Sequence, residues 1–281
     1  MALILNGKTL AVKVKQEVHD KVAEMKQAPG LAVILVGDDP ASRIYVDGKK
    51  RDCAECGIQS TEYHFDSDVT MDTLLKLVEK LNADPAVDGI LCQLPLPEGL
   101  DENKVLLAIS PEKDVDCFHP YNVGMLMMGE SVFQPCTPAG IMRLLDEGHV
   151  SVEGKHCVVI GRSNIVGKPM GIMLLQRNGT VTYCHSYTRN LAEITRQADI
   201  LVTAVGKVNL ITADMVKEGV AVIDVAMNHN EKGKLCGDVD FAAVSEKAGA
   251  ITPVPGGCGP MTRAMLMVNT LAAAKLHGKG N

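Results

Sequence analysis

The stretch that decides the fold reads His156-Cys-Val-Val-Ile160-Gly161-Arg162-Ser163-Asn-Ile165-Val-Gly167-Lys-Pro169. Its first five residues are mostly apolar and rich in Val and Ile, a pattern that predicts a buried strand. Gly161 permits a tight exit turn, and Pro169 suits the first turn of a helix. Backbone amides at such a helix start can bind a phosphate. The stretch therefore predicts either a phosphate-binding turn or a plain strand–helix junction, because Ser163 replaces the middle glycine of G-x-G-x-x-G.

Short apolar runs and helical patterns alternate on both sides of this stretch, which indicates parallel sheets in an α/β fold. In the second half, three further strand-like runs at βαβ spacing favour the dinucleotide-binding interpretation. The predicted strands are residues 31–36, 89–94, 157–161, 181–184, 200–204 and 220–225. The predicted helices are residues 12–25, 41–56, 71–81, 138–146, 169–177 and 213–218.

Two breaks in the alternation predict the domain organisation. The pattern lapses near residues 118–137, and residues 252–260 are rich in Gly and Pro. We predict a first α/β domain over residues 1–118, joined by a C-terminal helix within 261–281. A second, Rossmann-like domain is expected over residues 137–255, with the substrate cleft between the two domains.

Composition excludes several classes of protein. The 281 residues carry a formal net charge of −6, which argues against a nucleic-acid backbone as the main partner. No apolar stretch approaches the roughly 18 residues of a membrane span, and the first residues do not resemble a signal peptide. Nine scattered cysteines lack the spacing of a disulfide framework, so we expect reduced thiols in a cytoplasmic protein.

In the predicted second domain, the end of the second strand bears on the choice of dinucleotide. An NAD site usually places an acidic residue there to hold the ribose hydroxyls. Here residues 181–184 lead to no acid before Glu193. Arg162, Ser186 and Arg189 offer donors to a 2′-phosphate instead, although Arg189 alone is equally compatible with a solvated loop charge. The pattern favours NADP.

The first domain holds three groups of polar residues with possible chemistry. Tyr45 and Lys49 are four residues apart and share a helix face, although spacing alone more often means a solvated face. Gln93 ends a buried strand, where α/β sheets bind ligands. Asp114 and Asp116 lie in a polar loop; acids in such loops are more often caps or turn residues.

Two other features of the sequence bear on ligand and metal binding. The loop 252–262 is stiff, and its glycines would let a planar ligand approach the backbone. Cys53 and Cys56 form a C-x-x-C pair, but no second pair completes a zinc site, so packing is the simpler explanation. The histidines make no ligand pattern, and no metal is expected.

Taken together, these segments resemble the bifunctional methylenetetrahydrofolate dehydrogenase/methenyltetrahydrofolate cyclohydrolase family, in family order along nearly the whole chain. The departures from the family pattern are Cys117, Ala226 and Cys258, where the family commonly has Gly, Gly and Val. The matching stretches are Leu35-Val-Gly-Asp-Asp-Pro40-Ala-Ser, Tyr45-Val-x-x-Lys49, Asp88-Gly-Ile-Leu-x-Gln93-Leu-Pro-Leu-Pro97, Lys113-Asp-Val-Asp116, Phe118-His-Pro-Tyr-Asn-Val-Gly124, Pro135-Cys-Thr-Pro138, Gly161-Arg-Ser-x-Ile-Val-Gly167-x-Pro169, Gly237-Asp-Val239 and Thr252-Pro-Val-Pro-Gly-Gly-x-Gly-Pro-Met-Thr262.

The resemblance implies two reactions of folate one-carbon metabolism. NADP+ oxidises 5,10-methylenetetrahydrofolate to the methenyl form, and water then converts that form to 10-formyltetrahydrofolate. It further implies a homodimer formed through the second domain. Implied catalytic residues are Lys49, Tyr45 and Gln93; implied substrate-binding residues are Tyr45, Gln93, Asp116, Pro255, Gly256 and Gly259; implied cofactor-binding residues are Gly161, Arg162, Ser163, Ile165 and Ser186.

Two other kinds of protein are compatible with the sequence. A shikimate-type NADP dehydrogenase also places a substrate domain before a nucleotide domain, although residues 93–97 and 255–257 speak against it. A non-catalytic dinucleotide-binding or folate-binding module would bind the same ligands without turnover.

Overall fold

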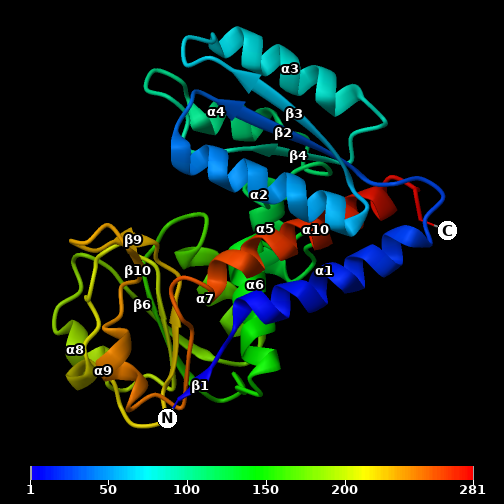
Figure 1. Cartoon of the computed structure of the whole chain (residues 1–281). Coiled ribbons are helices and arrows are strands. Elements are labelled where there is room, and N and C mark those ends of the chain that lie inside the picture. Colours follow the sequence, from blue (N-terminus) through cyan, green and yellow to red (C-terminus); the bar gives the residue numbers. More distant parts are fainter. Residues whose placement is uncertain (1, 281) are drawn as a thin grey trace. The chain divides into compact units, whose positions relative to one another are not determined.

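The computed structural model describes residues 2–280, which form two compact units. The six-stranded unit takes the chain up to Ala11 together with Thr137–Thr262. The three-stranded unit takes Val12–Cys136 and the chain from Arg263 onward. Each unit has its own parallel sheet, so the predicted pair of α/β domains is confirmed (Figure 1).

The sheet of the six-stranded unit is parallel throughout, in the order β1-β11-β8-β7-β5-β6. Strand β5 lies between β6 and β7, so the chain crosses from β5 to its neighbour on one side and then returns past β5 to its neighbour on the other side. This is a topological switch point, where open α/β sheets bind ligands at the carboxyl ends of the strands. The strands are β1 (Leu3–Ile4), β5 (His156–Ile160), β6 (Thr180–Cys184), β7 (Ile200–Thr203), β8 (Ala221–Asp224) and β11 (Ala250–Ile251).

Helices α7, α8 and α9, all of α6 (Cys136–Glu147) after its first residue, and some short elements complete this unit. Helix α7 follows the glycine turn after β5, and the small antiparallel pair of β9 and β10 follows β8. The core consists of apolar side chains from the central strands and the segments that cover them, such as Val158, Leu201 and Val222. The elements are α7 (Gly167–Gln176), α8 (Leu191–Thr195), η1 (Ala213–Met215), β9 (Asn228–His229), β10 (Leu235–Cys236) and α9 (Phe241–Ser245).

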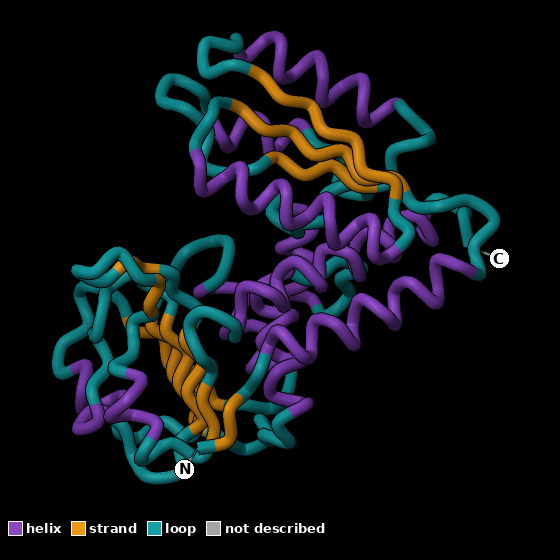
Figure 2. Tube along the Cα trace, in the orientation of Figure 1, coloured by secondary structure: helices purple, strands orange, loops and turns teal. Residues whose placement is uncertain are grey.

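The three-stranded unit has β2 (Gly30–Val36) at its centre, with β3 (Gln59–Phe65) and β4 (Gly89–Cys92) as parallel edges. Alternate side chains of β2 and β4 pack with helices α3 (Met71–Ala83) and α4 (Glu102–Ala108) in one core cluster. Helix α2 lies on the opposite side of the sheet from α3 (Figures 1 and 2). The other helices with residues in this unit are α1 (Gly7–Ala23), α2 (Pro40–Cys56), α5 (Pro120–Met128), α6 (Cys136–Glu147) and α10 (Cys258–Leu276).

Helix α2 begins and ends at residues whose chemistry favours those ends. The Asp39 carboxylate accepts a hydrogen bond from Ser42 N at 2.8 Å, and Pro40 occupies the first turn. Gly57 follows the helix in the left-handed conformation, with φ of 73°. These ends place residues 45–52 in the middle of a regular helix.

The observed boundaries differ from the predicted ones in two places. The prediction places residues 1–11 in the first domain, but β1 pairs with β11 and extends the sheet of the six-stranded unit. The prediction also places a break between the domains near residues 118–137, but residues 118–136 contain α5 and belong to the three-stranded unit. Both segments are short, and tertiary packing rather than local pattern decides where they lie.

The helix predicted over residues 213–218 was wrong. Only the single turn η1 forms, because Val216 is already extended, with φ of −127° and ψ of 150°. The Val216 side chain is buried in the core, and six residues are too few to propagate a helix against that packing. Within residues 2–280, no helix is long and apolar enough to cross a membrane.

Candidate active site

Lys49 and Gln93 meet in the three-stranded unit. Lys49 lies on α2, and Gln93 directly follows the carboxyl end of β4. The Lys49 ammonium donates a hydrogen bond to Gln93 Oε1 at 2.9 Å. The other end of the Gln93 amide donates to the Leu94 carbonyl at 2.7 Å, which keeps its oxygen towards Lys49. The lysine is therefore held at the end of a buried strand rather than on a solvated helix face.

Among the charged groups around Lys49, Asp116 has the largest effect on its pKa. Desolvation lowers the pKa of Lys49, and the negative charge of Asp116 partly opposes that decrease. Desolvation raises the pKa of Asp116, and Lys49 in turn opposes the rise. The Cys136 thiol lies 3.6 Å from Asp116 Oδ1. The pair is thus an acid and a base whose pKa values burial moves towards neutrality, as proton transfer near pH 7 requires.

Asp114 and Asp116 have different surroundings although they are two residues apart. Asp114 accepts hydrogen bonds from Phe118 N at 3.1 Å, His119 N at 2.8 Å and Asn122 Nδ2 at 2.8 Å. These bonds cap the turn that leads into α5, so Asp114 supports the loop. Asp116 is the acid of this loop that shares its environment with Lys49.

Tyr45 lies one turn before Lys49 on the same face of α2 and is half-buried. Burial raises the pKa of the Tyr45 phenol, and the nearby Arg263 of α10 opposes that rise. Arg263 also lowers the pKa of Lys49. Arg263 is not among the residues predicted from the sequence. The one local hint was Gly48, which leaves room for another side chain on the helix face between Tyr45 and Lys49.

In the six-stranded unit, the glycine turn after β5 has the expected geometry. Gly161 has a φ of 123°, which favours glycine, and a Cβ there would lie 2.7 Å from the Ala204 carbonyl oxygen. The Ser163 hydroxyl accepts from Val166 N and Gly167 N, both at 3.2 Å. Ser163 therefore stabilises the start of α7 at the position where the usual fingerprint has its middle glycine.

The other predicted cofactor residues lie around the same edge of the sheet. The guanidinium carbon of Arg162 lies 5.6 Å from the centre of the Tyr187 ring, a cation–π contact. Ser186, which follows β6, and Ile165, in the turn before α7, are exposed. A hydroxyl, a guanidinium and a glycine turn are thus presented at the carboxyl ends of β5 and β6.

The loop after β11 carries Pro255 and Gly256, and Gly259 lies in the first turn of α10 that follows. All three belong to the six-stranded unit rather than to the unit of Lys49. Gly256 has a φ of 113°, and its carbonyl accepts from Lys8 N at 3.1 Å. A Cβ on Gly7 would lie 1.8 Å from the Gly257 carbonyl oxygen. The glycines therefore allow this loop to pack tightly against the start of α1.

Two buried acids, not selected from the sequence, organise the loops beside this site. Asp238 accepts from Thr203 Oγ1, Val205 N and Lys207 N at 2.6–2.9 Å. Asp224 accepts from Ala226 N, Asp238 N and Val239 N at 2.9–3.2 Å. Desolvation raises the pKa of Asp224 to about 6. The two carboxylates fix the segments that follow β7 and β8.

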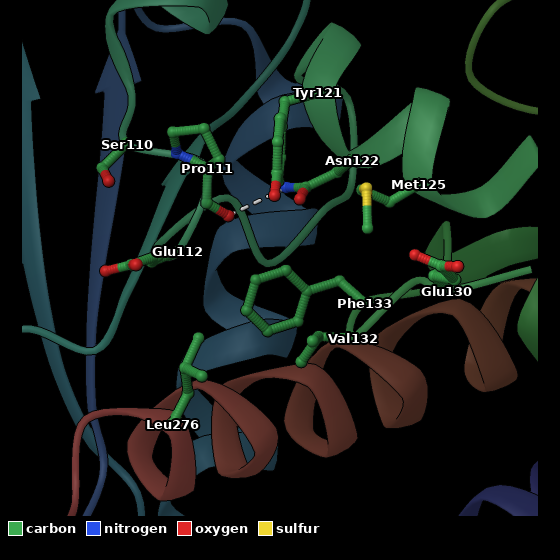
Figure 3. A pocket seen from close by; sticks show the side chains of 10 residues that line it. All are labelled: Ser110, Pro111, Glu112, Tyr121, Asn122, Met125, Glu130, Val132, Phe133 and Leu276. Carbon is green, nitrogen blue, oxygen red and sulfur yellow. Dashed lines mark hydrogen bonds between the residues drawn. The ribbon is translucent and has the colours of Figure 1, made fainter. Parts of the chain in front are cut away.

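A pocket of about 440 Å³ lies elsewhere in the three-stranded unit, around α5 and the end of α10 (Figure 3). The Asn122 amide donates to the Pro111 carbonyl at 2.9 Å beside it. The pocket contains none of the predicted catalytic, substrate-binding or cofactor-binding residues, so it is separate from the Lys49 group. Its lining consists of Ser110, Pro111, Glu112, Tyr121, Asn122, Met125, Glu130, Val132, Phe133 and Leu276.

Comparison with known proteins decides the family. The family model for the catalytic domain of tetrahydrofolate dehydrogenase/cyclohydrolase matches residues 5–116. The model for the NAD(P)-binding domain of the same family matches residues 135–278. The chain belongs to the tetrahydrofolate dehydrogenase/cyclohydrolase family. The resemblance noted in the sequence is thereby confirmed, as are dehydrogenase and cyclohydrolase activities for the chain.

Individual relatives of the tetrahydrofolate dehydrogenase/cyclohydrolase family match over the whole length. The bifunctional protein FolD of Acetivibrio thermocellus is 56% identical over 281 residues, covering 99% of each chain. The crystal structure of the bifunctional FolD of Campylobacter jejuni superposes with a TM-score of 0.96 at 51% identity, covering 98% of this chain and 99% of that one. The FolD of Trypanosoma brucei, solved with NADP cofactor and inhibitor, has a TM-score of 0.93 at 37% identity, with 98% of each chain covered.

The shikimate alternative shares the fold but not the family. A shikimate 5-dehydrogenase from Thermus thermophilus has a TM-score of 0.54 and only 16% identity, a likeness of fold alone. The tetrahydrofolate dehydrogenase/cyclohydrolase assignment therefore stands against that alternative.

Proposed function

We propose that this chain oxidises 5,10-methylenetetrahydrofolate to the methenyl form with NADP+ and hydrolyses that product to 10-formyltetrahydrofolate. The observation that carries the proposal is the polar group of Lys49, Gln93 and Asp116 in the unit matched by the family's catalytic domain. The substrate carries its own iminium electrophile, so residues that move protons and hold the pterin suffice for the hydrolytic step.

Lys49 is proposed as the central catalytic residue. Its lowered pKa increases the share of neutral amine near pH 7, and a neutral amine can accept a proton from the attacking water. Gln93 accepts a hydrogen bond from Lys49, which keeps the amine in one place and leaves the amide to align water or carbonyl. Tyr45, on the same helix face, is proposed to flank the folate ring and to orient Lys49.

Asp116 is proposed to hold the pterin. The aminopyrimidinone edge presents adjacent N–H donors, and a carboxylate accepts two such bonds in one plane. Asp114 already accepts three hydrogen bonds from its own loop, which supports the choice of Asp116. Pro255, Gly256 and Gly259 are proposed to contribute a stiff backbone surface with little side-chain bulk against the planar ligand.

The six-stranded unit is proposed to bind NADP through Gly161, Arg162, Ser163, Ile165 and Ser186. The fit rests on the open glycine turn and on the donors at the carboxyl ends of β5 and β6. Arg162 and Ser186 suit a 2′-phosphate, and no acidic residue follows strand β6 before Glu193. When bound, NADP+ supplies the acceptor for the hydride of the methylene bridge.

The setting of the enzyme is also proposed. All nine cysteines are free thiols, which supports a reducing compartment, the cytoplasm. A homodimer through the six-stranded unit is proposed from the family resemblance. Light scattering at micromolar concentration should give twice the chain mass of 30.0 kDa, and a 30.0 kDa species would contradict the dimer.

One spectrophotometric experiment tests the function. The purified chain is given methylenetetrahydrofolate with NADP+ or NAD+, and the appearance and decay of methenyl absorbance are followed. We expect turnover and subsequent decay, with higher catalytic efficiency for NADP+. Absence of turnover with both cofactors would overturn the proposal and favour a binding module, while equal efficiency would overturn only the choice of NADP.

A further inference from the structure

Gly48 leaves a gap in the face of α2 between Tyr45 and Lys49, and Arg263 fills it. A Cβ on Gly48 would lie 1.9 Å from Nη1 of Arg263 and 3.1 Å from its Cζ. Arg263 comes from α10, more than 200 residues later in the chain. The guanidinium therefore lies directly against the backbone of the helix turn that carries both predicted catalytic side chains.

Asp52 holds the guanidinium in this position. Arg263 Nε donates to Asp52 Oδ2 at 3.1 Å, and Lys15 donates to Oδ1 at 2.7 Å. Only 6% of the Asp52 side chain is exposed, so its charge has to be stabilised by partners in the protein rather than by water. Residues 45, 48, 49 and 52 are spaced i, i+3, i+4 and i+7, which places them on one helix face. The ion pair thus aligns Arg263 along that face.

The guanidinium acts on both neighbours electrostatically. A positive charge disfavours a second one, so Arg263 lowers the pKa of Lys49; it also opposes the burial that raises the pKa of Tyr45. Arginine retains its charge at every pH of interest, so this effect is constant. The titratable and charged groups that act on Lys49 come from α2, the 114–117 loop, the start of α6 and α10: Cys53, Asp116, Cys136 and Arg263.

We propose that Arg263 is a positioning residue for this enzyme, which uses Asp52 and the space at Gly48 to hold a fixed positive charge between Tyr45 and Lys49. The inference rests on the proposed function of Lys49. In this proposal, the C-terminal helix α10 acts on Lys49 through the charge of Arg263. Arg263 itself does not contact the reacting atoms.

The first test is the pH dependence of methenyl hydrolysis in Arg263→Gln. Loss of the positive charge should raise the pKa of Lys49, so the acid limb of the pH–rate profile should move to higher pH by roughly one unit. Arg263→Lys keeps a charge and should lie nearer the parent. Arg43→Gln is the matched control, because Arg43 is on α2 but pairs with Glu62 at 2.6 Å; it should leave the profile unchanged.

The second test uses the contact itself. Gly48→Ala changes neither Arg263 nor Asp52, but the added methyl group forces the guanidinium away from the helix. We expect Gly48→Ala and Arg263→Gln each to lower the rate of hydrolysis at neutral pH by several fold. The double variant should be no slower than the slower single variant, since one interaction is removed twice. If the double variant loses the product of the two single losses in rate, the two residues act independently. That result would overturn the proposal.

A third measurement does not need turnover. The rate at which an amine-reactive reagent acylates Lys49, followed by mass spectrometry across a pH series, reports the pKa of that amine. Arg263→Gln should move the curve to higher pH, and an unchanged curve would overturn the proposal. A parent protein that neither oxidises nor hydrolyses folate would overturn the proposed function, while this curve would still decide the role of Arg263. NADP+ binding and circular dichroism show whether each variant is folded.

Discussion

The two acids of the 114–116 loop should separate substrate binding from stability. Asp116→Asn keeps the side-chain volume but replaces one acceptor oxygen with a donor that would face the N–H groups of the pterin. Hydrogen bonds to charged groups contribute roughly 1.5–3 kcal/mol, and 1.4 kcal/mol is one decade of affinity. We therefore expect the KM for folate to rise by about tenfold to a hundredfold, with little change in NADP+ binding or in the urea midpoint.

Asp114→Asn should have the opposite profile. Its Oδ2 accepts from both His119 N and Asn122 Nδ2, so an amide nitrogen there would meet two donors. We expect the free energy of unfolding to fall by at least about 2 kcal/mol, read as a lower urea midpoint by circular dichroism. The reasoning is refuted if Asp116→Asn keeps its KM while Asp114→Asn loses folate affinity at unchanged stability.

Three further predictions concern other buried charges. Lys49→Met should slow methenyl hydrolysis by at least about a hundredfold, the usual share of general acid–base catalysis, while NADP+ still binds in a fluorescence titration. Lys279→Met removes a 2.8 Å partner from the fully buried Asp88 and should cost about 3 kcal/mol of unfolding free energy in urea, whereas Lys76→Met, whose side chain is 71% exposed, should cost under about 0.5. The pKa of Asp224 rises from 3.8 to about 6, so between pH 6 and 4 the native state takes up a proton that the unfolded chain does not, and stability from this group increases as the pH falls, by up to about 3 kcal/mol. If Asp224→Asn shows the same pH dependence of stability as the parent, the prediction for Asp224 is contradicted.

The central strands could be predicted from local sequence because burial on both faces demands consecutive apolar residues. Strand β2 is buried along its whole length, and its sequence, Gly-Leu-Ala-Val-Ile-Leu-Val, has no polar residue. The start of α2 could also be predicted, because Asp39 caps the helix and Pro40 occupies its first turn, and both effects are local. Strand β3 was missed because it is an edge strand with alternating exposure, and its polar residues resemble a loop.

Local pattern also selected Tyr45, Lys49 and Gln93, but it could not distinguish a solvated helix face from a polar group at the end of a strand. The hydrogen bond between Lys49 and Gln93 joins residues 44 positions apart, so only the sheet and its covering helix bring them together. The roles of Asp114 and Asp116 were likewise left open by their spacing. Their burial and partners distinguish them, because the capping bonds of Asp114 form only once α5 packs against the loop.

The sequence by itself determined the α/β class, the positions of most central strands along the chain and the family, because these depend on short-range periodicity and on motifs read along the chain. Tertiary structure alone decided that β1 joins the six-stranded sheet and that Arg263 occupies the gap at Gly48. A two-residue strand has no periodicity of its own, and its place follows from the free edge of β11. A missing side chain at one position and a guanidinium more than 200 residues later are unrelated in sequence. They become one feature because packing places the Arg263 guanidinium in the space above Gly48.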